Sequence, residues 1–387
     1  MKKSYAIITT AFLFLLLIWV DIVGVRTEDI AYSDREQRDL AAMPAYPVFY
    51  DPEQWAKEVD RYLMDQFPYR AEIIRQMHSV QAATGNNVVQ DLYQIDSDYL
   101  FTVTYPTNEK RTNLMAEELK AASESYSVPV VYAIVPLKTV SLADSIEEIS
   151  NETNLLNRDR TVAALEANGL DCIDICSYFL DDFRQDELQD FYFKSDFHWN
   201  PKGGYYAGVG MGEGLKELGY IENLPLTSDF QWIDFSLDRS YMGDLQRRIS
   251  EKPYPGEYIP FYELRRQDGL HYYIDLDGEE VERNTIVACG LEEEIFEYNR
   301  VSTYNLGYLR IENENAVNKK GVLIFKDSYQ NMTIDYLTDM FSEITVMDPR
   351  VLYCSFDEVM EHSHFDMILC IYHESNISEE LIKFLAE

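Results

Sequence analysis

A buried strand followed at once by a polar turn is predicted by the segment Gly321-Val-Leu-Ile-Phe-Lys-Asp327-Ser328. Its apolar run is short and continuous, which is typical of a strand covered on both faces of a parallel sheet. Proteins of the α/β class present their reactive groups at the carboxyl ends of such strands. Ser328 is therefore placed where a serine can act as a nucleophile. The alternative is a plain turn, because Asp and Ser side chains often bond to their own backbone.

Further continuous apolar runs alternate with helical patterns along most of the chain. The predicted strands are 92–101, 128–135, 171–175, 344–347 and 366–372, and the predicted helices include 111–125, 155–168 and 333–341. This alternation indicates an α/β fold with a mostly parallel sheet flanked by helices. Residues 221–320 break the rhythm with short alternating runs rich in Tyr, Asp and Glu, and they predict a β-rich insertion.

The segment Asp196-Phe-His-Trp199 carries the second chemical signature. A carboxylate two residues before a histidine can hold the imidazole in one tautomer, and the imidazole can then deprotonate a serine. Asn200-Pro201 follows as a helix start, with Asn as N-cap and Pro at the first helical position. His198 is either a structural residue ahead of that helix or a base. In the second case His198 Nε2 must reach Ser328 Oγ, with Asp196 on the Nδ1 side, as a Ser-His-Asp triad.

Two other groups of residues were weighed as ligand sites. His362-Ser-His364 with Asp366, and His373-Glu374, contain metal ligands by type but lack the helical His-Glu-x-x-His spacing. The glycines from Gly208 to Gly214 follow a helix start instead of a strand, which argues against a dinucleotide fingerprint. The sequence therefore predicts neither a metal nor a cofactor, and metal-dependent hydrolysis through the C-terminal histidines is the weaker alternative.

An uncleaved membrane anchor is predicted at the N-terminus. Lys2 and Lys3 precede a mostly apolar run that extends to Val25, which is long enough to span a bilayer and lacks a small-x-small cleavage site. The two lysines favour an inside N-terminus, so the rest of the chain is expected outside the cytoplasm. We expect three parts: a signal-anchor helix at 1–25, a connector and helical segment at 26–85, and one large domain at 86–387.

The overall charge narrows the range of partners. The formal net charge is -35, from 68 acidic and 33 basic residues, and nucleic-acid binding needs clustered Lys and Arg. A nucleic-acid partner is therefore not expected. The five cysteines are too few and too scattered for a disulfide scaffold.

The segments quoted above resemble the DHHW family of bacterial exported proteins, which is similar to the SGNH-hydrolase-like domains of alginate O-acetylation proteins. The resemblance is carried by Asp196-x-His-Trp199, Lys326-Asp-Ser-Tyr329, Glu36-Gln-Arg-Asp-Leu-Ala-Ala-Met-Pro44, Asp65-Gln-Phe-Pro-Tyr-Arg70 and Val135-Pro-Leu-Lys138. Here Phe197 stands where the family name records the first histidine, which leaves His198 as the base of the block. The Gly and Asn oxyanion donors typical of SGNH hydrolases have no match among these motifs.

The resemblance implies roles and partners for this chain. It implies Ser328 as nucleophile, His198 as base and Asp196 as the residue that orients the base, in an O-acetyltransferase or acetylesterase. The implied partners are a cell-surface polysaccharide and a membrane-embedded acyl donor protein, at a membrane-anchored, extracytoplasmic location. The alternative from a different class is a non-catalytic glycan-binding or assembly protein that keeps the same fold.

Overall fold

The computed structural model describes residues 29–33, 38–44, 52–67, 76, 88–89, 91–93, 97–146, 148–249, 252–276, 278–283, 294–298, 306–352 and 354–386. The chain divides into two compact units. The first comprises Met1–Gln90 with Arg247–Ile249, and the second comprises Asp91–Gln246 with Ser250–Glu387. Asp196, His198 and Ser328 all belong to the second unit.

In the first unit, polar side chains at the end of helix α2 (Pro52–Asp65) hold a segment that precedes it. Gln66 exchanges two hydrogen bonds with the backbone of Ile30, at 3.1 and 2.9 Å. Asp65 Oδ2 accepts from the backbone N–H of Ala41 at 2.9 Å. Part of the predicted connector is therefore bound to α2. The described residues of this unit also form the antiparallel strands β1 (Tyr32–Ser33) and β2 (Arg38–Asp39), and β3 (Val88–Val89).

The N-terminal predictions are tested only in part. The helical part of the predicted segment 26–85 is observed as α2, and 68–75 and 77–87 lie outside the described residues. The predicted anchor 1–25 also lies outside them. Within the part of the chain that the structure describes, no helix is long and apolar enough to cross a membrane.

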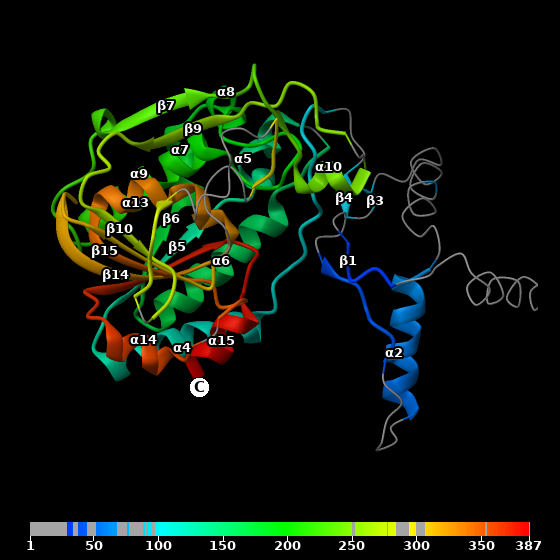
Figure 1. Ribbon diagram of the computed structural model, residues 1–387, viewed down its shortest axis with the longest axis horizontal. Helices are drawn as coiled ribbons and strands as arrows, with labels where there is room; N and C mark the ends of the chain where they lie inside the picture. Colours follow the sequence, from blue (N-terminus) through cyan, green and yellow to red (C-terminus); the bar gives the residue numbers. More distant parts are fainter. Residues whose placement is uncertain are drawn as a thin grey trace, which may run out of the picture. The chain divides into compact units, whose positions relative to one another are not determined.

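The second unit is built on an eight-stranded mixed sheet (Figure 1). Parallel pairing joins β15, β14, β16, β5 and β6, while β13, β10 and β11 extend the sheet with antiparallel pairs. All residues of β5 are buried, as expected of a strand covered on both faces. In spatial order the strands are β11 (Glu280–Val281), β10 (Leu270–Tyr273), β13 (Tyr308–Asn313), β15 (Phe341–Met347), β14 (Asn318–Lys326), β16 (Met367–His373), β5 (Val130–Val135) and β6 (Asp171–Asp174).

Helices cover both faces of this sheet (Figure 1). Successive residues of a strand point to opposite faces, so a continuous apolar strand presents apolar side chains on both faces. Val322 and Ile324 pack into one core with α7 (Ile175–Asp182), α8 (Gln185–Gln189), α9 (Pro201–Glu217) and α13 (Ile334–Met340). Leu323 and Phe325 pack into the other with α4 (Glu109–Tyr126), α6 (Glu152–Ala167), α14 (Phe356–His362) and α15 (Glu379–Ala386). The predicted α/β class is confirmed as a mixed sheet flanked by helices.

The region 221–320, apart from Arg247–Ile249, belongs to the same unit. It supplies the antiparallel edge strands β10, β11 and β13 to the central sheet. Two further pairs lie within it, an antiparallel pair of β7 (Phe230–Asp234) with β9 (Pro260–Leu264) and a parallel pair of β8 (Ser240–Tyr241) with β12 (Ile295–Phe296). Among the described residues, the further elements are β4 (Leu92–Tyr93), α5 (Lys138–Leu142), η1 (Ala143–Ser145), η2 (Thr227–Asp229), η3 (Ser328–Thr333) and α10 (Asp244–Ile249), whose last three residues are assigned to the first unit.

One predicted strand is wrong in extent. Residues 92–101 were expected to form a single strand, but β4 ends at Tyr93 and residues 97–99 bend. The backbone there is tied to other segments, since the N–H of Leu100 donates to the carbonyl of Lys194 at 2.8 Å. Local apolar character predicted burial correctly, with Phe101 1% exposed, but the two ends of the segment pair with each other, and the N–H of Tyr93 donates to the carbonyl of Phe101 at 3.0 Å.

Close packing accounts for the glycines of α9. A Cβ at Gly204 would lie 2.4 Å from the backbone oxygen of Met332 in η3, and one at Gly208 would lie 2.9 Å from the ring of Tyr336 in α13. Glycine at these positions lets α9 approach the segment that follows β14. The glycine run is therefore a packing surface, and it brings the helix after His198 against the turn that carries Ser328.

Candidate active site

Helix α9 fixes the end of the segment that carries His198. The Asn200 side chain accepts hydrogen bonds from the backbone N–H groups of Lys202 and Gly203, at 2.9 and 3.2 Å, and Pro201 is the first helical residue. The predicted N-cap is thus confirmed. The cap residue itself is held, because Asn200 Nδ2 donates to the carbonyl of Asp190 at 2.8 Å. Asn200 is fully buried, so the chain enters α9 along one fixed path.

Asp327 fixes the backbone on either side of the Ser328 hydroxyl. Its Oδ1 accepts from the N–H of Tyr329 at 2.9 Å, which caps η3. Its Oδ2 accepts from the N–H of His373 and from Asn376 Nδ2, both at 3.0 Å. The turn after β14 therefore begins a 3-10 helix at once, where the sequence predicted a longer turn. Ser328 lies at the carboxyl end of β14, as expected from the strand pattern.

The structure brings the three predicted residues into one hydrogen-bonded chain. His198 Nε2 lies 2.7 Å from Ser328 Oγ, and His198 Nδ1 lies 2.7 Å from Asp196 Oδ1. An ionised carboxylate can only accept, so Nδ1 carries the proton and Nε2 is left to accept from the serine hydroxyl. This order, carboxylate then imidazole then hydroxyl, is the arrangement that activates a serine.

Asp196 is held in one orientation by four donors. Oδ1 accepts from both the backbone N–H and the ring of His198, and Oδ2 accepts from the hydroxyl of Tyr241 at 3.1 Å and the backbone N–H of Asp244 at 3.0 Å. Burial raises the pKa of this carboxyl, but the adjacent imidazole and these hydrogen bonds outweigh burial and hold the pKa well below its ordinary value. Asp196 is therefore an anion at neutral pH.

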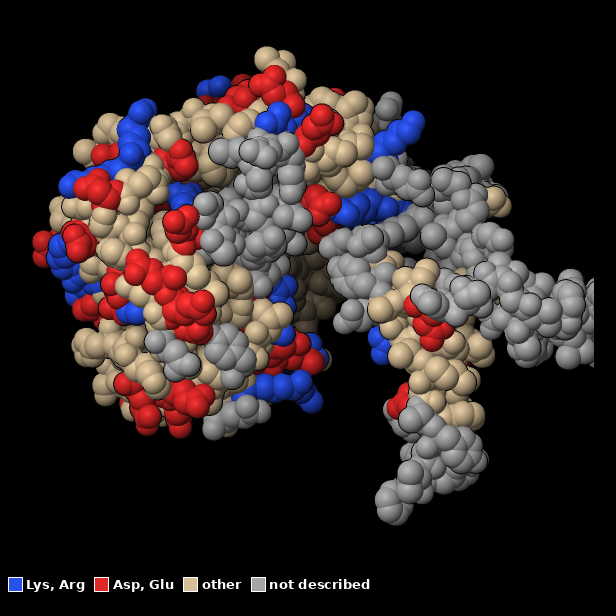
Figure 2. Space-filling view, in the orientation of Figure 1, with Lys and Arg blue, Asp and Glu red and all other residues tan. Residues whose placement is uncertain are grey.

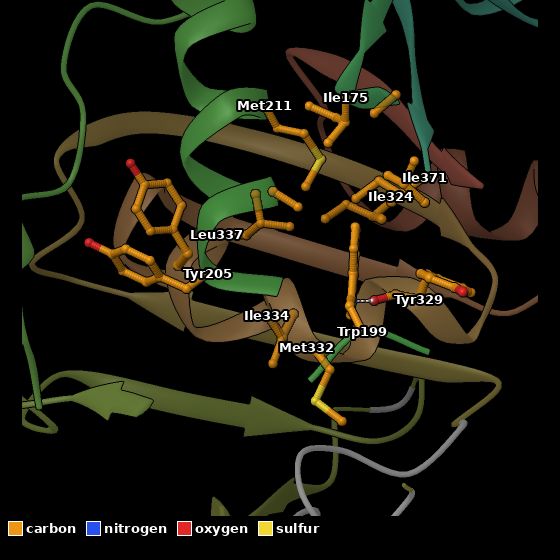
Figure 3. Packing of buried hydrophobic residues seen from close by; sticks show 14 of the residues in the cluster. Ile175, Trp199, Tyr205, Met211, Ile324, Tyr329, Met332, Ile334, Leu337 and Ile371 are labelled. Atoms are coloured by element: carbon orange, nitrogen blue, oxygen red, sulfur yellow. Dashed lines mark hydrogen bonds between the residues drawn. The ribbon is translucent and has the colours of Figure 1, made fainter. Parts of the chain in front are cut away.

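Two hydrogen bonds tie the histidine segment to the serine segment. Trp199 Nε1 donates to the carbonyl of Tyr329 at 2.9 Å, and the hydroxyl of Tyr329 donates to the carbonyl of Phe197 at 2.5 Å. Figure 3 shows the first bond as a dashed line, with Trp199 surrounded by residues of α9, α13 and the sheet. Since Trp199 and Tyr329 are both fully buried, the distance between His198 and Ser328 is set by packed side chains.

Aromatic rings enclose the imidazole of His198. The ring of Tyr298 stacks on it with centroids 3.6 Å apart and an angle of 12° between the planes, and Phe197 lies 3.9 Å away. The hydroxyl of Tyr298 donates to the carbonyl of Ser328 at 2.6 Å. An electron-rich ring face stabilises a cation placed over it, so Tyr298 favours the imidazolium that forms when Ser328 loses its proton.

Sequence reasoning missed the residues that complete this site from the region 221–320. Tyr241, Asp244 and Tyr298 contact the histidine or its carboxylate, and Glu257 binds the loop that leads to Asp196. None of them belongs to a motif, and each contributes through a tertiary contact. The high tyrosine count was the only hint, and it does not single out a position.

A metal centre was also considered. Within the described ranges, Asp196, His198 and Asp244 form the one group whose ligand atoms all lie within 4.8 Å of one another. Both oxygens of Asp196 already accept hydrogen bonds from the protein, and one ring nitrogen of His198 is engaged by that carboxylate. Hydrogen bonds within the protein therefore occupy Asp196 and one ring nitrogen of His198. His362, by contrast, contacts the carbonyl of Glu358 at 2.6 Å.

The chain is similar to known proteins both in part of its sequence and in its fold. Residues 97–268 match the family model described as SGNH hydrolase-like domain, acetyltransferase AlgX. This part of the chain is therefore similar to SGNH hydrolase-like domains of the AlgX type. The matched stretch contains Asp196 and His198 and ends before Ser328. No curated protein matches the sequence.

Solved structures with the same fold include two of Bacillus cereus PatB1. The one with a sulfonyl adduct has a TM-score of 0.64 and 19% identity over 76% of this chain and 97% of that chain. The other has a TM-score of 0.63 and 20% identity over 76% and 99%. A DHHW family protein from Eubacterium siraeum has a TM-score of 0.56 and 19% identity over 76% and 94%. The predicted resemblance to the DHHW and AlgX-type proteins is confirmed.

Proposed function

We propose that this protein is a serine-dependent acyl-transfer enzyme, an O-acetyltransferase or acetylesterase that acts on a cell-surface polysaccharide. The observation that carries the proposal is the chain of short contacts from Asp196 through His198 to Ser328. The description of the matching family model as an acetyltransferase, and the fold shared with PatB1, support the same class of chemistry.

The first half-reaction forms an acetyl-serine. Ser328 Oγ attacks the carbonyl carbon of the acetyl donor while its proton moves to His198 Nε2, and the carbonyl oxygen becomes an oxyanion. Asp196 stabilises the imidazolium through Nδ1–H. The carbon–oxygen bond to the donor then breaks, and the leaving oxygen takes the proton from Nε2.

The second half-reaction transfers the acetyl group to an acceptor. A hydroxyl of the acceptor gives its proton to His198 Nε2 and attacks the acetyl carbon, after which Ser328 leaves and recovers that proton. A sugar hydroxyl as acceptor makes the reaction O-acetyl transfer, and water makes it ester hydrolysis. The same three residues serve both outcomes, so the acceptor site decides between them.

The backbone N–H of Ser328 is our candidate for an oxyanion donor. It lies at the start of η3 on the residue that bears the nucleophile, and it makes no hydrogen bond to any described residue. By contrast, the next N–H along, that of Tyr329, is already bound to Asp327. A backbone donor beside the attacking oxygen can stabilise the charge that develops on the carbonyl oxygen.

The charge of the protein bears on its acceptor. On the face shown in Figure 2, acidic side chains are spread among basic ones, and the chain as a whole has a net charge of -35. Such a surface repels polyanions. We therefore propose a neutral or amino-sugar polysaccharide as acceptor, reached at the outer face of a membrane to which residues 1–25 anchor the chain.

The test is to trap the nucleophile. The purified protein is incubated with an activated acetyl ester and, separately, with a sulfonyl fluoride, and the Ser328 peptide is then weighed by mass spectrometry. We expect a stable sulfonyl adduct on Ser328, release of the ester's leaving group, and loss of both in S328A with an unchanged circular dichroism spectrum. A wild-type protein that gives neither adduct nor turnover would instead be a glycan-binding protein on this fold.

A further inference from the structure

The loop that leads to Asp196 has a buried backbone. Residues 193–198 have no helix or strand of their own, yet Phe193, Ser195 and Asp196 are fully buried. Backbone N–H and C=O groups in such a place must find partners within the protein, since water cannot supply them. The position of the catalytic carboxylate therefore depends on whatever binds this backbone.

Lys138 supplies the hydrogen-bond donors. It follows β5 at the start of α5, is 2% exposed, and points its amine at the loop. Nζ donates to the carbonyls of Phe193 at 2.9 Å, Lys194 at 3.1 Å and Asp196. An ammonium has three protons, so each of them is used on this loop.

Glu257 supplies the acceptors from the region 221–320. It is 4% exposed, its Oε1 accepts from the N–H of Lys194 at 2.5 Å, and its Oε2 accepts from the N–H and hydroxyl of Ser195 at 3.0 and 2.6 Å. The carbonyl of Ser195 is bound as well, by the N–H of Gln246 at 3.1 Å. Every residue from 193 to 196 is therefore held by Lys138, Glu257 or both.

Burial disfavours the charged form of both side chains. Burial lowers the pKa of Lys138 to about 7, against the opposing charges of Glu257 and Asp196, and it raises the pKa of Glu257. The aromatic rings of Tyr99 and Phe101 lie 5.7 and 5.4 Å from Nζ, where their faces favour a cation. A buried lysine and glutamate are costly to keep, and an apolar pair would pack as well without binding the loop.

We propose that Lys138 and Glu257 are positioning residues that clamp the loop 193–196 and thereby set where Asp196 meets His198. The proposal rests on the proposed function, since it assigns them a role in that reaction. If the proposal is right, loss of the clamp displaces the Asp196 carboxylate and leaves Ser328 and the acceptor site in place. An active-site displacement of about 1 Å can cost roughly 100-fold in rate.

The experiment compares K138M, which keeps the length of the side chain, with E257Q, which keeps its shape. The control is K202M, because Lys202 lies at the start of α9 and pairs with Asp190 at 3.1 Å, outside the clamp. Each protein is titrated with a sulfonyl fluoride so that kcat refers to active sites. The downfield proton resonance of His198 Nδ1–H is recorded by NMR in parallel.

We expect K138M to lower kcat about 100-fold and E257Q about 10-fold, with KM within about twofold of wild type. The Nδ1–H resonance should shift or vanish in both variants and stay in place in K202M. A wild-type kcat per titrated site, with an unmoved resonance, would show that the pair serves folding alone. If K138M does not fold, E257Q decides by the same two readouts.

The resonance also separates this proposal from the proposed function. A wild-type protein without turnover or adduct would refute the enzyme, and the clamp would still be tested by the proton signal. Wild-type turnover with an undisturbed signal in E257Q and K138M would refute the clamp alone.

Discussion

Replacement of Asp196 by asparagine tests the electrostatic core of the proposal. The substitution keeps the shape of the side chain but exchanges one acceptor oxygen for an NH2 donor and removes the charge. Asp196 now accepts from four donors, two on each oxygen, so an amide must turn its NH2 toward two N–H groups or toward one N–H and a hydroxyl. Either orientation leaves buried donors without an acceptor, which costs about 1–3 kcal/mol.

The expected loss of activity follows from the charge and the tautomer together. Without the carboxylate, the imidazolium formed at His198 has no counter-ion, and the Nδ1–H tautomer is no longer imposed. The equivalent change in a serine protease triad lowers kcat about 10⁴-fold. We therefore expect kcat of D196N to fall about 10³–10⁴-fold, equal to roughly 4–5.5 kcal/mol in activation free energy, with KM changed little.

The assay is steady-state hydrolysis of an activated acetyl ester, with active sites counted by sulfonyl fluoride. The matched control is D244N, since Asp244 lies in the same group of acidic and histidine side chains but contributes its backbone N–H to Asp196. That N–H survives the substitution, so D244N should keep kcat within about tenfold of wild type. Retention of more than a tenth of kcat by D196N, or equal losses in both variants, would refute the triad.

Three further predictions test other parts of the structure. Y298L should lower kcat about 2–10-fold, because it removes the ring stacked on His198. Y298F keeps the ring and should keep most of the rate, so an equal loss in both variants would contradict the stacking argument. G204A should lower the free energy of unfolding by several kcal/mol, because the new Cβ would lie 2.4 Å from the η3 backbone. Its control is G212A, whose Cβ would meet only the ends of side chains at 2.9 Å, and this variant should change stability in urea little. Burial, and then a neighbouring aspartate, raise the pKa of Asp339 to about 6, so ionisation of this group opposes folding as pH rises from about 4 to 6. D339N should therefore be about 1 kcal/mol more stable than wild type in urea at pH 8 and no different at pH 4, after allowance for solvent screening.

The sequence was informative wherever a local pattern sufficed. The apolar run before Ser328 and the cap after His198 are short-range signals, and both elements lie where they were predicted. Burial follows from apolar runs, but the pairing partner does not: the strand expected at 92–101 was wrong because the two ends of that segment pair with each other. A ladder also needs a partner strand in register, and this requirement is absent from the segment itself.

The parts that escaped prediction depend on contacts between distant residues. Asp196 is separated from Tyr241 by 45 positions, and Ser195 from Glu257 by 62. A single tyrosine or glutamate in a region rich in both carries no sign of such a contact. The antiparallel edge of the sheet was missed for the same reason, since β10 has only four residues and its alternation fits many arrangements.

The order of strands in the sheet has a consequence for how the protein is made. β5 lies between β6 and β16, and its residue Val130 pairs with Ile368, near the other end of the chain. β14 and β16, which are neighbours in the parallel part of the sheet, leave the ribosome well after β5 and β6. Contacts so far apart in sequence form slowly, and their unpaired edges stay exposed until both partners are present. A chain that stops short of β16 would leave the facing edges of β14 and β5 unpaired, and we expect such a chain to be cleaved by proteases faster than the complete sheet.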